Sequence, residues 1–597
     1  MQAIRSEQSR SVVDCLRTMP ESEKVPTVQD QQASLERRAR AWAAADPDPL
    51  SKAELESLLA EGNWAELAER MAGELEFGTA GLRGVVAAGS ARMNLAVVLR
   101  VTRALADQLL ARALDPRALP VVIGCDARLD SVRFADAAAR VLIAAGIPVK
   151  RFAEPVPTPF VAYAVRAFAA NAGIMITASH NPPEYNGYKL YWRDGVQVIP
   201  PTDHEIAARM SAMGPANAIA LGDLAQQESI SSDLEARYLA EVRGELPRVV
   251  AERDLRIVYT PLHGVGARVV ERLLGEVGYE HVSTVSEQRE PDGHFPTVSF
   301  PNPEEPGALD LALALAARDN ADLVLANDPD VDRLSVAVPT PSGRWLPLNG
   351  NQIGLLLADF ALAHSVSGSR ALVLASIVSS PMLESIAAKY GARCERVLTG
   401  FKWVWTAGVT LEAESYRFCF GYEEALGYSI GRAVRDKDGI SAALAFAELA
   451  SEARAAGSTV LERLHALYRE HSLWVSVQHN VVLKGATGAA RIAQAMKRLS
   501  SEPPRELAGE SVSSTRDLGV PEPGAPIWRG GTSLVELRLA GGGRLFARPS
   551  GTEPKLKLYV DIQAQLTPEV SIIAEEERAR SRALDLARAL VSALALD

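Results

Sequence analysis

Cysteine is scarce in this sequence. The 597-residue chain has four cysteines, Cys15, Cys125, Cys394 and Cys419, and none of them forms a C-x-x-C pair. The sequence therefore predicts neither a structural zinc site nor a disulfide framework. Sparse, unpaired cysteines fit a reducing compartment.

Long apolar runs and an excess of positive charge are also absent. No run approaches the ~18–20 residues that span a bilayer, and the charged residues Arg5, Glu7, Arg10 and Asp14 interrupt any signal-peptide core. The net charge of −11 argues against nucleic acid or an acidic membrane surface as the main partner. We expect a soluble cytoplasmic protein that holds any anionic substrate with local basic groups.

The chain is long and apolar enough for several cores. Hydrophobic residues make up 47% of it, and at roughly 150 residues per domain its length predicts about four domains. Residues 35–71 show helical spacing, and strand-like runs then alternate with helix-like stretches, which is typical of α/β layers. These runs cover residues 120–124, 172–176, 255–259, 322–326 and 371–375.

The C-terminal part has a different pattern. Residues 501–531 are rich in Pro, Gly and Ser and predict loops, strand-like runs follow at 534–539 and 555–562, and 575–596 is helical. We therefore expect an α/β protein with three similar mixed α/β domains and a C-terminal α+β domain. The predicted divisions are a helical extension at 1–47, then 48–240, 241–348, 349–472 and 473–597.

An isolated serine follows one of the apolar runs. Ser179 lies in Thr177-Ala-Ser-His-Asn-Pro182, directly after the strand-like residues 172–176. Enzymes of the α/β class place reacting groups at such strand ends. The alternative is a plain turn or helix cap, because Ser, Asn and Pro are turn residues for local reasons. Three further loops favour the reactive interpretation.

An acidic loop follows the run at 322–326. Asp328, Asp330 and Asp332 alternate along it, so that on extended backbone their side chains point to one side. Three converging oxygen donors suit Mg²⁺. An EF-hand calcium loop fits poorly, because Arg333 replaces the required Gly and Pro339 the required Glu. A solvated acidic turn is the other alternative, but apolar residues flank the loop on both sides.

Two more loops complete the set. Arg548-Pro-Ser-Gly-Thr-Glu-Pro-Lys555 offers a guanidinium fork and hydroxyl and backbone donors that suit phosphate, although its composition is also that of an ordinary turn. In Gly421-Tyr-Glu-Glu-Ala-Leu-Gly427 two glutamates follow an apolar run and precede a glycine. At least one of these carboxylates is expected to face a cleft, where it could accept hydrogen bonds from sugar hydroxyls.

These four loops, in this order, resemble those of the α-D-phosphohexomutase superfamily, which includes phosphoglucomutase, phosphomannomutase and phosphopentose enzymes. The similarity covers about residues 40–597, and the Glu-Glu-Ala sequence looks most like the phosphoglucomutase/phosphopentomutase branch. Further matching segments are 77–84, 126–131, 291–293, 301–305 and 399–403. The resemblance implies four domains around a central cleft.

The resemblance also implies roles for individual residues. Ser179 would carry a phosphate, and its oxygen would join Asp328, Asp330 and Asp332 in holding Mg²⁺. The transfer site would be lined by Arg83, His180 and Lys189, with Lys189 as a candidate acid/base group. The substrate would be bound by Arg333, Thr399, Gly400, Lys402, Glu423, Arg548, Ser550, Gly551 and Thr552. The four domains would carry, in chain order, the phosphoserine, the metal loop, the sugar-recognition loop and the phosphate-binding loop.

The implied activity is a phosphosugar mutase that works through a sugar bisphosphate, with glucose 1,6-bisphosphate as activator. Small sugar phosphates would be the only partners, and the protein would be a monomer or weak homodimer. Glucose phosphate is the expected substrate, with pentose or mannose phosphate as the alternative. Many hexose-phosphate members carry Ser where this chain has Ala425, so one hydroxyl contact is missing.

Other classes of function fit less well. A hydrolase would need only one phosphate site, whereas this sequence predicts two. A sugar-phosphate sensor without activity would not need the serine, the three aspartates and Arg548 together. A dinucleotide-binding enzyme is disfavoured, because no G-x-G-x-x-G opens a helix after a strand.

Overall fold

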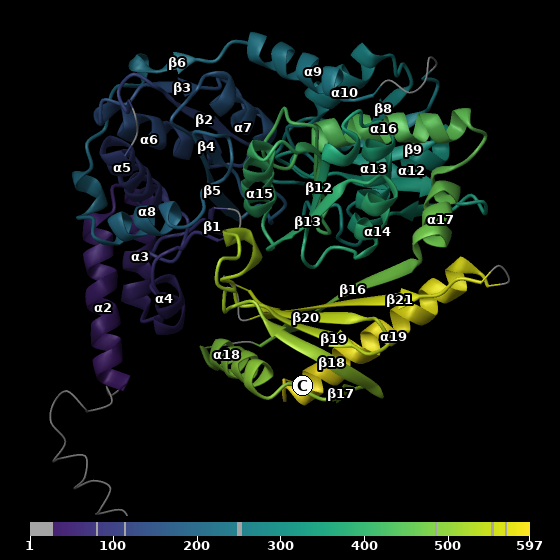
Figure 1. Ribbon diagram of the computed structural model, residues 1–597. Coiled ribbons are helices and arrows are strands. Elements are labelled where there is room, and N and C mark those ends of the chain that lie inside the picture. The colour runs from purple at the N-terminus through teal and green to yellow at the C-terminus, as the bar shows by residue number, and fades with distance from the viewer. Residues whose placement is uncertain are drawn as a thin grey trace, which may run out of the picture.

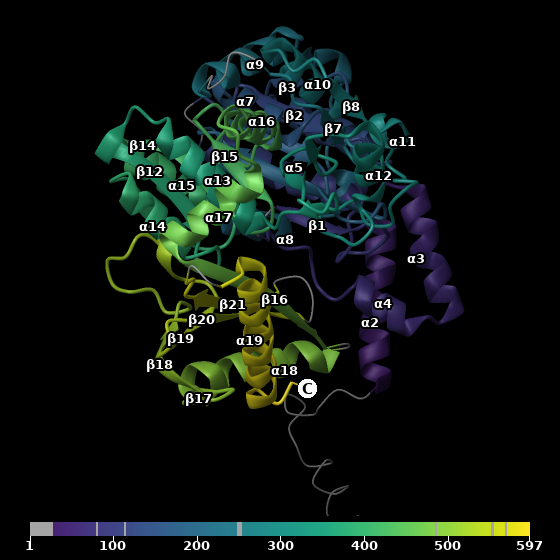
Figure 2. The same ribbon diagram turned by 90° about the vertical axis from the view of Figure 1, so that its right-hand side faces the viewer.

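The computed structural model describes residues 28–78, 81–112, 115–247, 253–483, 486–550, 555–567 and 570–596. In these residues the strands form four sheets, which divide the chain into four consecutive units. Helices α2 (Val28–Ala45), α3 (Pro49–Glu61) and α4 (Trp64–Arg70) precede the first sheet. Figure 1 shows the last unit, coloured light green and yellow, below the other three, and Figure 2 shows the same separation from the side.

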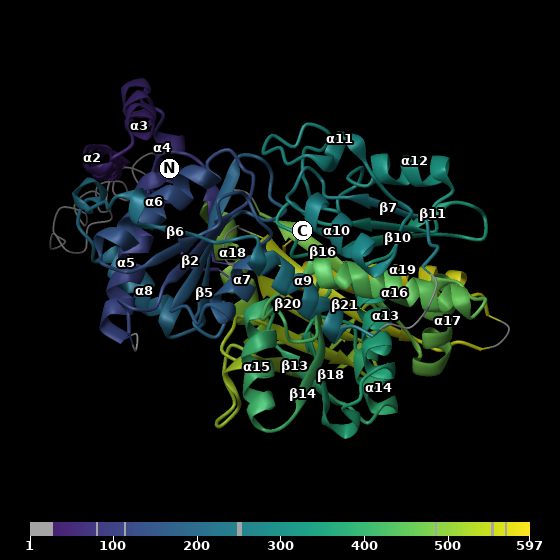
Figure 3. The same ribbon diagram turned by 90° about the horizontal axis from the view of Figure 1, so that it is seen from above.

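The three leading helices form a small body of their own. Leu35, Leu55, Leu59 and Leu67 are buried together between them, which confirms the helical pattern predicted for residues 35–71. The contacts that attach this body to the first unit include an ion pair from Arg133 to Asp48 and the Arg100 guanidinium over the Trp42 ring. In Figure 3 the three helices lie at one corner of the molecule.

The first unit is built on a six-stranded sheet in the order β1-β5-β4-β2-β3-β6. Its strands are β1 (Leu82–Val85), β2 (Val121–Cys125), β3 (Val149–Arg151), β4 (Ala172–Ile176), β5 (Tyr185–Trp192) and β6 (Glu228–Ser229). Its helices are α5 (Leu95–Arg112), α6 (Ser131–Ala144), α7 (Thr158–Ala167), α8 (Thr202–Ser211) and α9 (Asp233–Glu245), with short 3₁₀ turns η2 (Ala216–Ala218) and η3 (Leu224–Gln226).

The second and third units follow the same plan with fewer strands. The second has β7 (Ile257–Thr260), β8 (Val282–Thr284), β9 (Leu323–Ala326), β10 (Ser335–Pro339), β11 (Trp345–Pro347), α10 (Ala267–Val277), α11 (Ser286–Arg289) and α12 (Asp310–Asp319). The third has β12 (Ala371–Ser376), β13 (Arg393–Val397), β14 (Arg417–Glu423), β15 (Gly427–Ile430), α13 (Gly350–Ala363), η4 (Gly368–Arg370), α14 (Met382–Lys389), α15 (Phe401–Ala413), α16 (Gly439–Ala455) and α17 (Val460–His471).

Each of these three sheets has parallel central strands and an antiparallel edge. Strand β2 runs parallel to β3 and β4, β7 to β8 and β9, and β12 to β13 and β14. Strands β5, β10 and β15 then pair antiparallel at one side. Strands β2, β4, β7, β9 and β12 are buried at every position, as expected where helices cover both faces of a parallel sheet. Three similar mixed α/β units are therefore confirmed.

The last unit is an antiparallel sheet with two helices, which confirms the α+β prediction. Its elements are β16 (Leu473–Val482), β17 (Glu506–Leu507), β18 (Glu510–Asp517), β19 (Val535–Leu539), β20 (Arg544–Pro549), β21 (Lys555–Ala564), α18 (Ala486–Ser501), η5 (Ile527–Arg529) and α19 (Ile572–Ala593). Figure 1 shows α18 and α19 on the side of this sheet away from the other units.

One expectation for the last unit was wrong. Residues 501–531 predict loops, but β17 and β18 lie within them. Strand β18 reads Glu-Ser-Val-Ser-Ser-Thr-Arg-Asp and none of its residues is buried, so the apolar alternation that marks a strand is missing. Strand β18 forms because its main chain pairs with that of β19. Among the described helices, none combines the length and apolar character needed to cross a membrane.

The parallel strands decide where the polar loops lie. Ser179 follows β4, Asp328 follows β9, and Glu423 is the last residue of β14. Loops at the carboxyl ends of parallel strands gather at one edge of a sheet. Each α/β unit therefore contributes one of the predicted loops from the same end of its sheet.

Candidate active site

The main chain around Ser179 is tightly held. Ser179 has a φ of +54°, a left-handed conformation that costs a non-glycine residue of order 1–3 kcal/mol. Its N–H donates to the Thr177 hydroxyl at 2.9 Å, which in turn donates to Asp126 at 2.6 Å. Arg128 donates to the Ser179 carbonyl oxygen at 2.8 Å. These contacts fix the main chain that carries the serine hydroxyl.

That hydroxyl points at the acidic loop of the second unit. Ser179 Oγ donates to Asp328 Oδ2 at 2.6 Å, and both residues are buried. The ligand oxygens of Asp328, Asp330 and Asp332 lie within 4.8 Å of one another. The structure thus brings Ser179 and the three aspartates together, whereas their roles stay predictions.

The three aspartates fit a divalent cation. Oδ1 of Asp330 and Oδ1 of Asp332 are both buried, and within the part of the chain that the structure describes neither has a hydrogen-bond partner. Buried oxygens without partners are costly unless a cation meets them. Carboxylate oxygens are the donors that Mg²⁺ prefers. The donor set therefore suits the predicted Mg²⁺.

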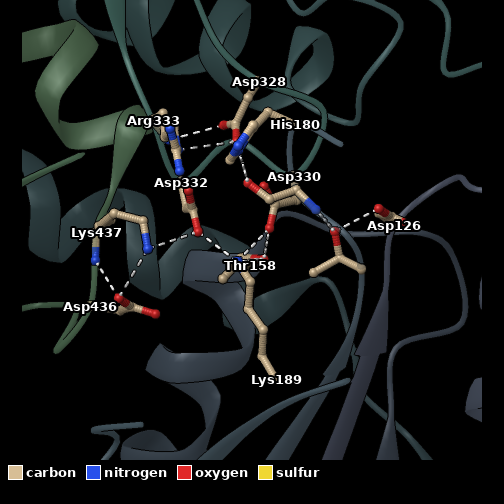
Figure 4. Close-up of polar contacts among 12 residues, drawn as sticks. Asp126, Thr158, His180, Lys189, Asp328, Asp330, Asp332, Arg333, Asp436 and Lys437 are labelled. Atoms are coloured by element: carbon tan, nitrogen blue, oxygen red, sulfur yellow. Dashed lines mark hydrogen bonds and ion pairs between the residues drawn. The ribbon is translucent and has the colours of Figure 1, made fainter. Parts of the chain in front are cut away.

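Two lysines balance the charge of the acidic loop (Figure 4). Lys189 Nζ lies 2.7 Å from Asp330 Oδ2 and 2.6 Å from Asp332 Oδ2, and Lys437 Nζ lies 3.1 Å from Asp332 Oδ2. Burial would raise the pKa of Asp330, but Lys189 outweighs it and holds that pKa well below its usual range. Burial and then the neighbouring carboxylates raise the pKa of Asp328 to about 8.

Lys189 is engaged by the acidic loop in this conformation. Besides the two carboxylates, its ammonium lies 3.5 Å from the Thr158 hydroxyl, so its three N–H groups all have partners. His180 is closer to the serine: its Nδ1 lies 3.2 Å from Ser179 Oγ. Burial, then Arg333 and Arg83, lower the pKa of His180 well below its usual value. The acid/base role of Lys189 stays a prediction.

Two arginines and an aromatic ring enclose this centre. Arg83 lies on β1 and donates to the Asn181 side chain at 2.7 Å; burial and then Arg333 lower its pKa to about 10. Arg333 lies 3.9 Å from Asp328 and, on its other side, 3.9 Å from Glu304. The Phe300 ring stacks on His180 with centroids 6.2 Å apart.

The third unit contributes the segments predicted for sugar recognition. Glu423 Oε1 accepts a hydrogen bond from the Gly400 N–H at 2.7 Å. Gly400 has φ +121° and ψ 120°, a conformation open to glycine and strained for other residues. Burial and then Glu424 raise the pKa of Glu423 to about 6. The buried Thr399 hydroxyl has no hydrogen-bond partner among the described residues.

Two neighbours of these segments have other partners. Lys402 Nζ lies 3.5 Å from Asp203 on α8 of the first unit, so in this conformation it joins two units. Glu424 accepts hydrogen bonds from Ser376 and Ser379 at 2.8 and 3.1 Å. Of the adjacent glutamates, Glu424 is therefore the anchor of the loop.

The last unit presents the predicted phosphate-binding residues. Arg548 lies on β20 and Ser550 directly follows that strand, whereas Gly551 and Thr552 lie outside the described residues. Arg548 faces Lys557 across the ladder. Burial, then Arg548 and Lys555, lower the pKa of Lys557, and the charges of Glu424 and Arg333 also act on it. This strand face is therefore basic and close to the other loops.

Three residues at the site were missed by sequence reasoning. Lys557 stands two residues after Lys555, the period that puts both on one face of a strand, so this signal was available. Lys437 lies in Arg435-Asp-Lys-Asp-Gly439, whose charged pattern was visible but could not be assigned to the acidic loop. Thr158 donates to Asp330 Oδ2 at 2.6 Å, and no local pattern marks it.

A fixed serine against a buried acidic triad, ringed by lysine and arginine, is the arrangement of an enzyme that transfers phosphoryl groups. The sequence matches four successive domains of one protein family, phosphoglucomutase/phosphomannomutase. Alpha/beta/alpha domains I, II and III match residues 74–215, 236–343 and 349–471, and the C-terminal domain matches residues 507–575. The chain belongs to this family of phosphosugar mutases.

Relatives with different substrate names are similarly close. A Haemophilus influenzae protein named "Probable phosphomannomutase" is 38% identical over 480 residues, covering 79% of this chain and 93% of its own. Human phosphopentomutase is 34% identical over 564 residues, covering 89% and 92%. Human glucose 1,6-bisphosphate synthase is 32% identical over 567 residues, covering 90% and 91%. The sugar is therefore not decided by similarity.

A solved structure shares the fold. The open form of Paramecium parafusin, a phosphoglucomutase, superposes with a TM-score of 0.64 at 17% identity, covering 87% of this chain and 96% of its own. At this identity the likeness supports the fold alone.

Proposed function

We propose that the protein moves a phosphoryl group between two positions of one sugar monophosphate, with Ser179 as the carrier. The observation that carries this proposal is the 2.6 Å hydrogen bond from Ser179 Oγ to Asp328, made by a serine whose main chain is fixed. A hydroxyl held against an acidic loop in this way is placed for transfer rather than for folding.

The proposed reaction has two balanced steps. In the first, a sugar hydroxyl attacks the phosphorus of phosphoserine and gives its proton to a base of the protein, while the bond from Ser179 Oγ to phosphorus breaks and Oγ takes up a proton from an acid of the protein. The sugar bisphosphate turns over in the site. The Ser179 hydroxyl then attacks the other phosphate and gives its proton to the same acid/base group that protonated it, while the departing sugar oxygen takes back the proton held by the base. His180 lies closest to the serine oxygen and Lys189 close to the acidic loop.

The acidic loop is proposed to hold Mg²⁺ through Asp328, Asp330 and Asp332, together with the oxygen of phosphorylated Ser179. When bound, Mg²⁺ supplies Lewis acidity and neutralises charge on a transferring phosphoryl group. Arg333 and Arg83, which lie beside the loop and the serine, add positive charge for the same group. Both are partly buried, where electrostatic interactions are stronger than in open water.

A second basic site distinguishes a mutase from a hydrolase. Arg548 and Lys557 in the last unit supply charge for the phosphate that does not react. With both ends of a sugar bisphosphate held, either phosphate can occupy either site after the sugar turns over. Glucose 1,6-bisphosphate is accordingly the proposed activator of protein that has lost its phosphate.

We propose that the sugar site accepts glucose phosphates and pentose phosphates. Glu423 supports glucose, because a carboxylate can accept hydrogen bonds from two neighbouring hydroxyls. Ala425 supports pentose, because it offers no partner to a further hydroxyl, and the relative named phosphopentomutase aligns over 89% of this chain. Mannose phosphate stays a third alternative.

Labelled glucose 1-phosphate tests the carrier role. Intact-mass measurement should show a phosphate on the wild-type protein that exchanges with the label, and none on Ser179→Ala. The variant should also lack mutase activity, with an unchanged melting temperature as control for folding. A Ser179→Ala protein that retains most of the activity contradicts the proposal. Release of inorganic phosphate at the rate of isomerisation would show a hydrolase instead.

A further inference from the structure

The last unit extends a loop onto the third unit. Residues 518–534, here called the docking loop, connect β18 to β19 and carry η5. The loop is closed at its base, where the Leu518 N–H donates to Leu534 O at 2.9 Å and the Gly531 N–H donates to Leu518 O at 2.7 Å. The docking loop is therefore a formed projection of the last unit.

Trp528 inserts from the docking loop into the third unit. Its side chain is buried, with 6% of the residue exposed, in an apolar cluster with Leu398 and Phe401. Its indole N–H donates to Glu395 Oε1 at 3.0 Å, and Arg529 donates to the same oxygen at 2.7 Å. Buried apolar contact and two hydrogen bonds to a buried carboxylate make this a specific attachment.

The attachment of Trp528 reaches the sugar-recognition segment directly. The carbonyl oxygen of Trp528 accepts a hydrogen bond from the Leu398 N–H at 2.8 Å. Two residues later, the Gly400 N–H donates to Glu423 Oε1 at 2.7 Å. The docking loop thus holds one end of the short segment whose other end orients the Glu423 carboxylate.

A second contact reaches the same loop from the other side. Arg544 on β20 donates to the Ser379 carbonyl oxygen at 2.7 Å and to Asp561 of its own sheet at 2.7 Å. The Ser379 hydroxyl donates to Glu424 Oε2 at 3.1 Å and accepts the Glu424 N–H at 3.2 Å. Arg544 is therefore connected through one residue to the neighbour of Glu423.

We propose that Trp528 and Arg544 are positioning residues for sugar recognition. Trp528 acts through Leu398–Gly400, and Arg544 acts through Ser379 and Glu424. Through these contacts, the last unit positions the Glu423 carboxylate. Phosphate binding and sugar selection are then coupled, because one unit holds the phosphate and also fixes the carboxylate that contacts the sugar. The inference rests on the proposed role of Glu423.

Conservative variants test the coupling. Trp528→Phe keeps an aromatic ring in the apolar cluster but removes the indole N–H, and Arg544→Lys keeps the charge beside Asp561 but loses the fork that spans two partners. Arg538→Lys is the matched control, because Arg538 is exposed on the same sheet and donates to Glu536 of its own strand. Each variant is assayed with glucose 1-phosphate and ribose 1-phosphate, and its melting temperature is measured.

We expect Trp528→Phe and Arg544→Lys to lower kcat/KM roughly 2- to 10-fold, the scale of one net hydrogen bond, and to change the ratio between the two sugars. Partial unfolding would lower kcat/KM for both sugars by the same factor and leave their ratio unchanged. In a Glu423→Gln background the same changes should have little further effect, because residues in one network are not additive. The inference is overturned if the Trp528 and Arg544 variants have the same kcat/KM values as Arg538→Lys. It is also overturned if their losses in kcat/KM add fully to the loss caused by Glu423→Gln.

The Glu423→Gln protein alone keeps the two hypotheses apart. If it has wild-type kcat/KM for both sugars, the proposed sugar contact of Glu423 fails. If Glu423→Gln is impaired and the Trp528 and Arg544 variants are not, only the positioning inference fails.

Discussion

Thr158 donates two hydrogen bonds to Asp330, one from its hydroxyl to Oδ2 at 2.6 Å and one from its N–H to the main-chain oxygen at 2.9 Å. Thr158 begins α7 of the first unit, whereas Asp330 belongs to the acidic loop of the second. The pair therefore joins the unit that carries Ser179 to the unit that carries the proposed metal site, and it orients one carboxylate of that site.

Replacing Thr158 with Val should weaken Mg²⁺ binding. The loss of a hydrogen bond that orients a metal ligand typically costs 10- to 100-fold in affinity, and we expect a rise of about that size in the Mg²⁺ concentration for half-maximal activity. Thr158→Ser retains the hydroxyl and should stay close to wild type. An unchanged Mg²⁺ dependence in the valine variant, with calorimetry in agreement, would show that Thr158 serves only to pack the two units.

Chelation should abolish turnover and leave the fold in place. Lys189 and Lys437 already neutralise part of the charge of the acidic loop, so the loop does not depend on a metal to fold. Activity in EDTA with and without added Mg²⁺, and the melting temperature of both samples, measure this. Full activity without divalent cations would contradict the proposed metal role. A large loss of melting temperature would make the metal structural.

Sugar binding should weaken below pH 6. Burial and Glu424 raise the pKa of Glu423 to about 6 from its ordinary 4.5, so this carboxylate is mostly ionised above pH 6 and mostly protonated below it. A protonated Glu423 loses an acceptor for sugar hydroxyls, and KM should rise as the pH falls through 6. The sugar phosphate itself titrates near pH 6, and Glu423→Gln is the control because it retains that titration.

The raised pKa of Glu423 also makes the stability of the fold depend on pH. A carboxyl that binds its proton more tightly in the folded state stabilises the fold at low pH, and this stability is lost as the pH rises through about 6. The melting temperature of wild type relative to Glu423→Gln should therefore decline across that range. Parallel pH profiles of KM and melting temperature for the two proteins would show that Glu423 does not titrate there.

Arg548 and Lys557 should contribute to binding and not to the transfer step. Replacing either with Ala removes charge-assisted hydrogen bonds worth about 1.5–3 kcal/mol each, or roughly 10- to 150-fold in kcat/KM. The slow hydrolysis of phosphoserine by water should change little. If that hydrolysis falls as far as turnover, these side chains act at the transfer centre.

Discrimination between sugars should be modest. An apolar gap such as the one at Ala425 separates substrates by roughly 10- to 200-fold, whereas a site that pairs every hydroxyl reaches about 10⁴-fold or more. We expect kcat/KM for glucose 1-phosphate and ribose 1-phosphate to differ by no more than roughly 200-fold. Ala425→Ser should widen the ratio in favour of glucose. A wild-type ratio below one identifies pentose phosphate as the preferred substrate.

The sequence predicts the α/β units well because their strands are apolar and buried on both faces. Strand β4 has the predicted limits of 172–176, and strands β9 and β12 each differ by one residue from the predicted 322–326 and 371–375. Strand β18 was missed because its residues are polar and its partner β19 supplies the pairing. A local sequence pattern identifies a strand whose own residues are apolar and buried. It overlooks a polar, exposed strand that forms only because a neighbouring strand pairs with it.

The candidate site divides in the same way. Ser179 and the three aspartates follow strong strand signals, and their convergence follows from the carboxyl ends of parallel strands. Thr158 lies 172 positions before Asp330 in the chain, and only the packing of two units brings them together. The partners of Lys402 and Glu424 also depend on other units or strands, so neighbouring sequence could not reveal them.

The turn at Ser179 is held by contacts to its main chain. Asp126, Thr177 and Arg128 fix that turn through contacts that do not involve the serine hydroxyl. Under the proposed function, the chain thus leaves the ribosome with its transfer centre assembled and lacks only a first phosphoryl group. The delay before its first turnover in the cell is then set by the supply of a phosphoryl donor, and not by the maturation of a loop.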